Sequence, residues 1–183
     1  MNFRMNAAQL RKADPKLKIE NLKLKIKRRD IYIILDNVLD TYNIGSVFRL
    51  ADAVAAKKLY LCGGTATPPN PRIMKASINT TEWVDWEYVE TAKESVSKLK
   101  VQNPKLKVVA IEQDKRSVPY DKFDYNLPVC LIVGNETTGV SKEVLEMADA
   151  IVELPMFGVN ISLNVMVSLG IVLYEVIEKS KIS

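Results

Sequence analysis

The sequence predicts an α/β fold in which a parallel sheet is flanked by helices. Short, continuous apolar runs of strand length recur along the chain, and segments with helical spacing of apolar residues lie between them. Continuous apolar runs are typical of strands covered on both faces, and their alternation with helices indicates a parallel sheet. With 183 residues, 48% of them hydrophobic, the chain can form one domain with a substantial core.

The first half of the chain follows this alternation. Residues 31–35 form a continuous apolar run that predicts a buried strand. Polar residues 40–43 supply capping groups for a helix over 44–54, and a second strand over 59–62 ends at two glycines. The segments that follow are a loop with three prolines over 65–71, a short helix or lid over 75–81, an irregular strand over 83–89 and a helix over 90–100.

The second half repeats the alternation with longer polar loops. Residues 107–111 and 129–133 are both apolar runs that predict buried strands. Ser141 is a suitable N-cap for a helix over 141–148, because its hydroxyl can accept a backbone N–H. A short strand over 150–153 and a long helix over 162–179 complete the chain.

The long last helix is apolar around almost its whole circumference until Glu175 and Glu178. A helix that is apolar on all sides has to be buried on all sides. In a small domain one face can pack on the sheet, so we expect another face to meet a second copy of the chain. The sequence therefore predicts a homodimer through the C-terminal helix; a helix enclosed within one subunit is the alternative.

Positive charge is concentrated near the N-terminus. Residues 1–30 contain ten Lys and Arg against three Asp and Glu, a net charge of +7, whereas the remainder has sixteen against nineteen, a net charge of −3. We therefore expect residues 1–28 to form a basic, partly helical arm on a domain spanning residues 29–183. Such an arm suits contact with a polyanion such as RNA, and a solubilising terminus is the alternative.

The composition excludes several classes of site. The chain has no histidine, which excludes Ser-His-Asp and Cys-His catalysis, and Cys62 and Cys130 lie in apolar runs typical of buried, reduced thiols. Two thiols without histidine make a zinc site improbable, so we expect no metal. No run approaches the roughly 20 apolar residues of a membrane span, and the N-terminus has no signal-peptide pattern. We expect a cytoplasmic protein that does not contact membranes.

Two loops near the C-terminus have the features of a ligand site. Residues 131–141 and 154–165 each run from strand-like residues into a polar, glycine-containing loop and then into a helix start. That arrangement places both loops at the carboxyl edge of a parallel sheet, where open α/β proteins bind ligands. The first resembles a nucleoside-triphosphate loop, but Val140 stands where that loop needs a lysine, and Glu136 adds a negative charge. Since a carboxylate repels phosphate, we expect a neutral or cationic ligand.

Three motifs occur in a fixed order along the chain: Asn43 with Arg49 six residues later, Gly134-Asn135-Glu136-x-x-Gly139, and Leu154-Pro155-Met156-x-Gly158 followed by Ser162-Leu163-Asn164-Val165. Together they resemble the SpoU/TrmH group of the SPOUT superfamily, RNA ribose 2′-O-methyltransferases that use S-adenosylmethionine. The resemblance extends from about residue 31 to the C-terminus. It implies that the C-terminal segment of the sheet domain is threaded into a trefoil knot, an arrangement that local patterns cannot reveal.

The same resemblance implies a cofactor site. The matching positions contact S-adenosylmethionine largely through backbone groups, which suits a planar, apolar adenine. Glu136 is compatible with this ligand because the donor sulfur is a cation. The positions that match cofactor contacts are Gly134, Leu154, Met156 and Leu163.

The resemblance also implies a polar active site, made by Asn43, Arg49, Glu136, Ser162 and Asn164. An arginine pKa above about 12 makes Arg49 a poor base. A guanidinium that grips the neighbouring phosphate and stabilises the developing alkoxide is the easier role. A surface ion pair with Asp52 is the alternative for Arg49. We expect Asn164 and Ser162 to cap the last helix while facing the ribose, and Glu136 to orient Asn43 or Asn164.

These expectations converge on an S-adenosylmethionine-dependent methyltransferase that acts on a ribose 2′-hydroxyl of tRNA or rRNA. A catalytically silent RNA-binding dimer with the same fold is the alternative. A dinucleotide-dependent oxidoreductase is disfavoured, because residues 36–45 at the first strand–helix turn lack the G-x-G-x-x-G pattern.

Overall fold

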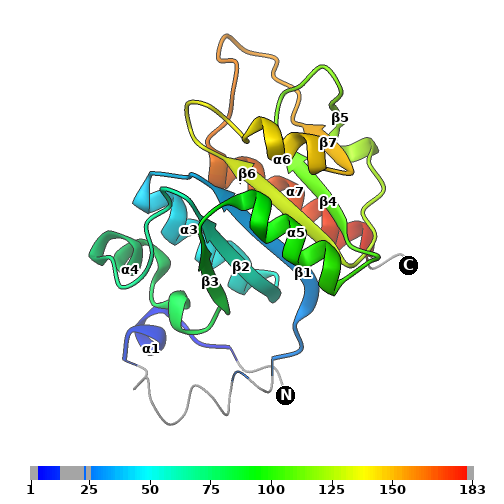
Figure 1. Ribbon diagram of the computed structural model, residues 1–183. Coiled ribbons are helices and arrows are strands. Elements are labelled where there is room, and N and C mark those ends of the chain that lie inside the picture. Colours follow the sequence, from blue (N-terminus) through cyan, green and yellow to red (C-terminus); the bar gives the residue numbers. More distant parts are fainter. Residues whose placement is uncertain (1–3, 13–22, 24–25, 181–183) are drawn as a thin grey trace.

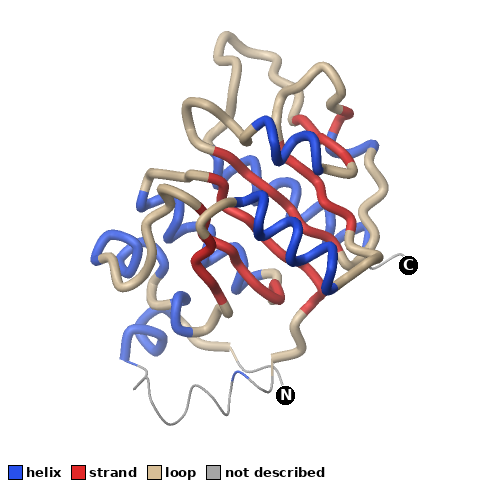
Figure 2. The backbone as a smooth tube through the Cα atoms, in the orientation of Figure 1, coloured by secondary structure: helices blue, strands red, loops and turns tan. Residues whose placement is uncertain are grey.

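Within the residues that the computed structural model describes, which are 4–12, 23 and 26–180, seven parallel strands form one sheet (Figures 1 and 2). In spatial order they are β3 (Trp86–Val89), β2 (Ala56–Cys62), β1 (Arg29–Asp36), β6 (Val129–Gly134), β4 (Lys107–Ile111), β7 (Ala150–Glu153) and β5 (Val118–Pro119). The predicted parallel α/β sheet is therefore confirmed. Because β6 lies between β1 and β4, a late segment of the chain occupies the middle of the sheet.

Helices cover both faces of this sheet. On one face lie α3 (Thr41–Ala53) and α7 (Val165–Ser180), and on the other lie α5 (Ala92–Gln102) and α6 (Lys142–Met147) (Figure 1). The remaining helix of the body, α4 (Pro71–Ser77), packs against α3 rather than on the sheet. The short helices are α1 (Ala7–Lys12), η1 (Thr80–Glu82) and η2 (Tyr120–Lys122).

The central strand β1 is buried on both sides, as its continuous apolar run predicts. Ile31, Ile33 and Leu35 belong to the core beneath α3 and α7. Tyr32 and Ile34 point to the opposite core, beneath α5 and α6. Successive side chains of a strand point to opposite faces, so an unbroken apolar run is what two covered faces require.

The structure differs from the sequence predictions at several boundaries. A helix begins at Pro71, where the sequence predicts the end of a loop, because Asn70 caps it: the Asn70 Oδ1 accepts the N–H of Arg72 at 2.9 Å and that of Ile73 at 3.4 Å. The last helix begins at Val165 and not at residue 162. Strand β5 was not predicted, since two residues are too short to show a pattern.

Ser141 precedes α6 as predicted, but its hydroxyl makes no capping hydrogen bond. Its backbone N–H instead donates to the Asp36 Oδ2 at 2.8 Å. Asp36 is buried at the end of β1, so this bond satisfies a carboxylate that is nearly inaccessible to water. The role of Ser141 is thus to connect the loop after β6 to the central strand.

Much of the predicted basic arm, including its run at residues 16–18, lies outside the described residues. Its end is anchored to the body by Arg28, whose Nη1 donates to the Ala56 oxygen at 3.2 Å and whose Nη2 donates to the Trp83 oxygen. The Lys23 Nζ lies 3.7 Å from the Asp85 carboxylate. None of the described helices has the length and apolar character of a membrane span.

Both cysteines are buried and free, as predicted. Burial raises the pKa of Cys62 to about 11, with the Ser95 hydroxyl 3.3 Å from its sulfur opposing the shift. Burial also raises the pKa of Cys130. Both thiols are therefore protonated and unreactive at neutral pH.

Helices α3 and α4 are in close contact at Gly45. A β-carbon at this position would lie 2.6 Å from the Ala76 Cβ and 2.8 Å from the Ile73 carbonyl oxygen. Both distances are shorter than van der Waals contact, and one of the atoms is backbone. The absence of a side chain at Gly45 therefore sets how closely α4 is held against α3.

We predict that Gly45→Ala destabilises the protein by about 1–3 kcal/mol, because the added methyl group overpacks the helix crossing. This loss should exceed the gain of about 1 kcal/mol that alanine brings to a helix interior. Gly170→Ala is the matched control, since a β-carbon there would meet only the side chain of Leu50, at 3.4 Å from Cδ2 and 3.5 Å from Cδ1. Urea denaturation measures both; equal midpoints for the two variants would contradict this account of the crossing.

Candidate functional site

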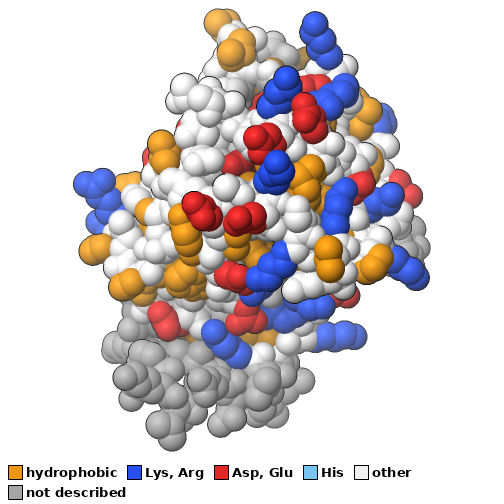
Figure 3. All heavy atoms as spheres, in the orientation of Figure 1, with side chains coloured by type: hydrophobic (Ala, Val, Ile, Leu, Met, Phe, Trp, Pro, Cys, Tyr) orange, Lys and Arg blue, Asp and Glu red, His pale blue; other side chains and the backbone are white. Residues whose placement is uncertain are grey.

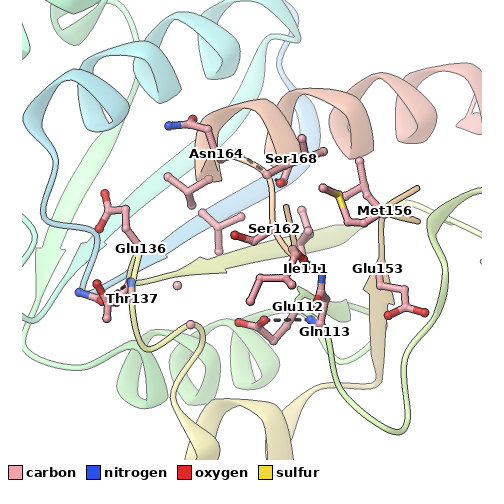
Figure 4. A pocket seen from close by; sticks show the side chains of 18 of the residues that line it. Ile111, Glu112, Gln113, Glu136, Thr137, Glu153, Met156, Ser162, Asn164 and Ser168 are labelled. Carbon is pink, nitrogen blue, oxygen red and sulfur yellow. Dashed lines mark hydrogen bonds between the residues drawn. The ribbon is translucent and has the colours of Figure 1, made fainter. Parts of the chain in front are cut away.

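The loops after β6 and β7 line a cavity of about 530 Å³. Residues 133–137 form one side, residues 160–165 face them, and Ile111–Gln113 at the end of β4 close a third side (Figure 4). All three segments follow or lead from the carboxyl ends of strands, which is where the sequence places a ligand site. The four predicted cofactor positions, Gly134, Leu154, Met156 and Leu163, all line this cavity.

The charge of the lining is negative. Glu112, Glu136 and Glu153 contribute carboxylates, and no Lys or Arg is among the residues that line the cavity. Three carboxylates around one cavity disfavour an anionic ligand and favour a cationic one. Among the described residues no group of His, Cys, Asp and Glu has the arrangement of a metal site. The cavity therefore suits an organic cation.

The loop after β6 is folded back tightly on itself. Asn135 and Gly139 exchange two backbone hydrogen bonds, of 3.0 Å and 2.9 Å. A β-carbon on Gly134 would lie 2.1 Å from the Gly139 carbonyl carbon, and Gly139 has a positive φ of 70°. Glycine is required at both positions, because one permits backbone contact and the other a left-handed conformation. The two glycines thus let the loop fold back onto its own backbone beside the cavity.

Glu112 holds this loop in place. Its Oε2 accepts the N–H of Val140 at 2.9 Å, and its Oε1 accepts the N–H of Gln113 at 2.8 Å. The next residue, Gln113, donates from Nε2 to the carbonyl oxygen of Ile161 at 2.5 Å. Side chains at the end of β4 therefore connect the two loops that face each other across the cavity.

Three of the predicted polar residues are brought together in a chain of hydrogen bonds. The Asn164 Nδ2 donates to the Asn43 Oδ1 at 3.0 Å, and the Asn43 Nδ2 donates to the Glu136 Oε1 at 3.0 Å. Glu136 also accepts the backbone N–H of Leu39 and of Asp40, each at 3.0 Å. One residue from each sequence motif takes part, so the chain joins segments that are far apart in sequence.

The hydrogen bonds to Glu136 change its acidity. Burial is the largest single influence and works to raise the pKa, but the N–H of Leu39, the amide of Asn43 and the N–H of Asp40 together outweigh it. The pKa of Glu136 therefore lies below its ordinary value. Glu136 is ionised at neutral pH, with both oxygens already accepting hydrogen bonds, and it is unsuited to act as a base.

Asn164 and Ser162 occupy different places at the start of α7. Both line the cavity (Figure 4). The Asn164 Oδ1 accepts the N–H of Met166 at 3.0 Å, so Asn164 caps the helix while its amide group reaches Asn43. Ser162 lies in the exposed segment before the helix and does not cap it. The double role predicted for the pair fits Asn164, whereas Ser162 has only the cavity-lining place.

Arg49 lies apart from this network. It is on the exposed side of α3 and does not line the cavity. Within the described part of the chain, no ion pair joins it to Asp52. Burial raises the pKa of Asp52, and the nearby charge of Arg28 opposes this shift. The ion pair between Arg49 and Asp52, which was the alternative role for Arg49, is therefore not formed among the described residues.

The sequence interpretation missed the residues at the end of β4. Glu112 and Gln113 follow directly after the apolar run of residues 107–111, at the edge of the sheet where the ligand site was expected. Their position after a predicted parallel strand was the available signal. Asn135 was also missed, although its Oδ1 accepts the N–H of Thr137 at 2.8 Å and shapes the loop.

A parallel α/β sheet with an acidic, backbone-lined cavity at its carboxyl edge defines an α/β ligand-binding domain of the open-sheet class. Residues 30–174 of the chain match the SpoU rRNA Methylase family. The match covers most of the described chain and includes every motif of the cavity. The chain belongs to the SpoU rRNA Methylase family.

Individual relatives support this assignment. The tRNA (guanosine(18)-2′-O)-methyltransferase of Aquifex aeolicus is 36% identical over 155 residues, which are 83% of this chain and 71% of that protein. The crystal structure of the A. aeolicus TrmH/SpoU tRNA modifying enzyme superposes with a TM-score of 0.76 and 32% identity, over 89% of this chain and 84% of that one. The AdoMet-bound rRNA methyltransferase of Sinorhizobium meliloti has a TM-score of 0.75 and 29% identity, over 92% of this chain and 59% of that one.

We predict that Glu136→Gln destabilises the protein most above about pH 5 and least in acid. The lowered pKa means that ionised Glu136 stabilises the folded state above its unfolded pKa of about 4.5 and that this contribution disappears as the pH falls through the folded value. We expect a loss of about 1 kcal/mol at neutral pH, since solvent screens this surface network. The measurement is urea denaturation at pH 7 and pH 3.5.

The exposed Glu90 provides the control, because within the described residues it forms no hydrogen bond or ion pair with the network, and Glu90→Gln changes the same charge. Its effect should be small at both pH values. A Glu136→Gln effect that persisted unchanged at the acidic pH would contradict a role for the ionised carboxylate.

Proposed function

We propose that the protein is an S-adenosylmethionine-dependent RNA methyltransferase that transfers a methyl group to a ribose 2′-hydroxyl of tRNA or rRNA. The observation that carries the proposal is the acidic cavity joined to the Asn43–Glu136–Asn164 hydrogen-bond chain in a member of this family. The named relatives methylate guanosine 18 of tRNA or are rRNA methyltransferases. We also propose a cytoplasmic location, where such RNAs are found.

The cavity fits the cofactor in size and in charge. A volume of about 530 Å³ lies within the usual range for small-molecule sites. Ile111, Met156 and Leu163 give apolar surface for an adenine, and backbone groups around Gly134 are available to its polar edge. The carboxylates of the lining suit the sulfonium charge. When bound, S-adenosylmethionine supplies a methyl group on a positively charged sulfur, which is a good leaving group.

The residues of the chain then have separable tasks. Glu136 orients Asn43, and Asn43 orients Asn164, whose side chain lines the cavity. Ser162 is the second polar side chain available to the acceptor ribose there. Arg49 binds a phosphate next to the target nucleotide and stabilises negative charge on the 2′-oxygen, which proton loss to solvent creates. Alignment of the hydroxyl with the donor methyl supplies much of the acceleration.

We further propose a homodimer through α7. Val167, Ile171 and Tyr174 are exposed by 38%, 36% and 56% and lie at helical spacing on one face. Exposed apolar side chains continue from this face into the preceding loop, at Phe157, Val159, Ile161 and Leu163. Exposed apolar side chains gathered on one helix face and in the loop before it are typical of a protein interface. In a dimer, Arg49 can serve a site shared between subunits, which accommodates its place outside its own cavity.

The resemblance to knotted relatives extends the proposal to the chain path. We propose that the segment after β6 forms the trefoil knot of this family. Two observations support it: β6 lies in the middle of the sheet, and the loops at 135–140 and 154–164 face each other across one cavity. A catalytically silent RNA-binding dimer is the second candidate function, favoured only by the absence of Arg49 from the cavity lining.

We predict that the purified protein transfers tritiated methyl groups from S-adenosylmethionine to tRNA or rRNA and that the labelled linkage resists alkaline hydrolysis, because a 2′-O-methyl group blocks cleavage. Arg49→Ala should lower the rate by roughly 100-fold or more while leaving cofactor affinity unchanged. Filter-retained radioactivity and calorimetric titration are the measurements. Cofactor binding without any transfer to RNA would favour the silent dimer instead, and full activity of Arg49→Ala would remove the role given to that residue.

We predict that Tyr174→Glu converts a dimer into a monomer, because it places a charge in the apolar face of α7. Val101→Glu is the matched control: Val101 is 81% exposed and lies at the end of α5, on the opposite side of the sheet. Light scattering after size-exclusion chromatography should give twice the chain mass for the wild type and the control. A monomeric wild-type protein, or a dimeric Tyr174→Glu protein, would contradict the interface.

A further inference from the structure

Two cations on α4 have no partner within the described residues. Arg72 and Lys75 are both exposed, and neither side chain forms an ion pair or hydrogen bond there. They are three residues apart, so they lie on the same side of the helix. Several lysines elsewhere in the described chain are neutralised instead: Lys58 and Lys98 contact Glu87 at 2.6 Å and 2.5 Å, and Lys100 contacts Asp149 at 3.2 Å.

Arg49 belongs to the same surface. It follows Gly45 by four residues, and Gly45 is the point where α3 contacts the backbone of α4. Residues four apart lie on the same side of a helix, so Arg49 is on the side of α3 that turns toward α4. Figure 3 shows Lys and Arg side chains projecting at the left edge, beside the region that α3 and α4 occupy in Figure 1. We call Arg49, Arg72 and Lys75 the basic ledge.

The ledge rests on a rigid support. Asn70 caps the start of α4, and the Thr80 hydroxyl donates to the Ser77 carbonyl oxygen at 2.8 Å just beyond its end. Ile78 and Asn79 adopt positive φ angles of 53° and 61°. A left-handed conformation is costly for a β-branched residue and persists only where its surroundings impose it. Ser77 and Thr80, the residues on either side of this pair, are buried.

The charge around the ledge is of one sign. Residues 63–81 contain Arg72 and Lys75 and no acidic residue, although the chain after residue 30 has a net charge of −3. The cavity nearby is lined by three carboxylates, which repel an approaching polyanion. An RNA strand that delivers a ribose to this cavity therefore needs a cationic surface beside it. The basic ledge can provide this surface, because α4 packs against α3 and Asn43 of α3 is hydrogen-bonded to the cavity residue Asn164.

We propose that Arg72 and Lys75 bind backbone phosphates of the RNA strand that flanks the methylated nucleotide, on the side beyond the phosphate held by Arg49. The inference rests on the proposed function and specifies how that function acquires its substrate. Binding of this kind is independent of base identity, because phosphates carry no sequence information. The ledge positions the strand, and recognition of the target falls to other contacts.

The test compares Arg72→Gln/Lys75→Gln with Lys105→Gln/Lys107→Gln. Lys105 and Lys107 are exposed too, but they lie at the amino end of β4, on the edge of the sheet opposite the cavity. Both double variants remove two positive charges from exposed positions, so folding should be retained. RNA affinity is measured by fluorescence anisotropy across a range of salt concentrations, with cofactor affinity measured in parallel.

We expect the ledge variant to bind RNA roughly tenfold or more weakly at 0.15 M salt and to reduce the slope of log K against log salt by roughly 1.4–1.8, the loss of two phosphate contacts. The KM of the ledge variant for RNA should rise, while its kcat and its affinity for the cofactor stay unchanged. The control variant should match the wild type in all of these quantities. Equal behaviour of the two variants, with methyl transfer by the wild type intact, would overturn the ledge alone. Absence of RNA methylation by the wild type would instead overturn the proposed function.

Discussion

The arrangement of the site depends on one chain of hydrogen bonds, from Asn164 through Asn43 to Glu136. It joins the start of α7, the start of α3 and the loop after β6, which are separated by up to 121 residues of sequence. Each donor and acceptor in the chain has a defined partner, so a shift of one segment would exchange these hydrogen bonds for bonds to water. The network therefore sets the relative positions of three segments that the hydrophobic core holds only approximately, since core packing fixes helices and not the loops between them.

Backbone contacts also hold the loop after β6 in place. Gly134 and Gly139 allow the loop after β6 to touch itself, and Glu112 fixes the folded loop by accepting the N–H of Val140. The cavity is consequently bounded in part by main-chain atoms held by hydrogen bonds, together with the carboxylates and the apolar side chains of Ile111, Met156 and Leu163. A site built in this way loses little conformational entropy when a ligand binds, because its walls are already ordered.

Sequence patterns revealed what is local or periodic. The continuous run at residues 31–35 predicted a strand covered on both faces, and the polar loops after two apolar runs predicted the edge where the cavity lies. They could not show relations between distant segments. These are the hydrogen bond between Asn164 and Asn43, the hydrogen bond from the Val140 N–H to Glu112, and the position of β6 within the sheet. Likewise, the start of α4 depends on the conformation of Asn70, whose capping potential is visible in sequence but whose use is not. Residue roles, by contrast, came from the resemblance and not from patterns.

Methyl transfer from a cationic donor to a polyanionic acceptor sets two opposite demands on neighbouring surfaces. The carboxylates of Glu112, Glu136 and Glu153 would stabilise a bound cationic donor, but the same charges repel RNA phosphates. Screening does not remove the conflict, because the Debye length is about 10 Å at 0.1 M salt and the reacting groups must approach much closer. Separating the charges in space does remove it. Cations on α3 and α4 can bind the phosphates while the acidic cavity holds the donor. The close contact of the two helices at Gly45 then contributes to methyl transfer, because it sets the positions of these cations.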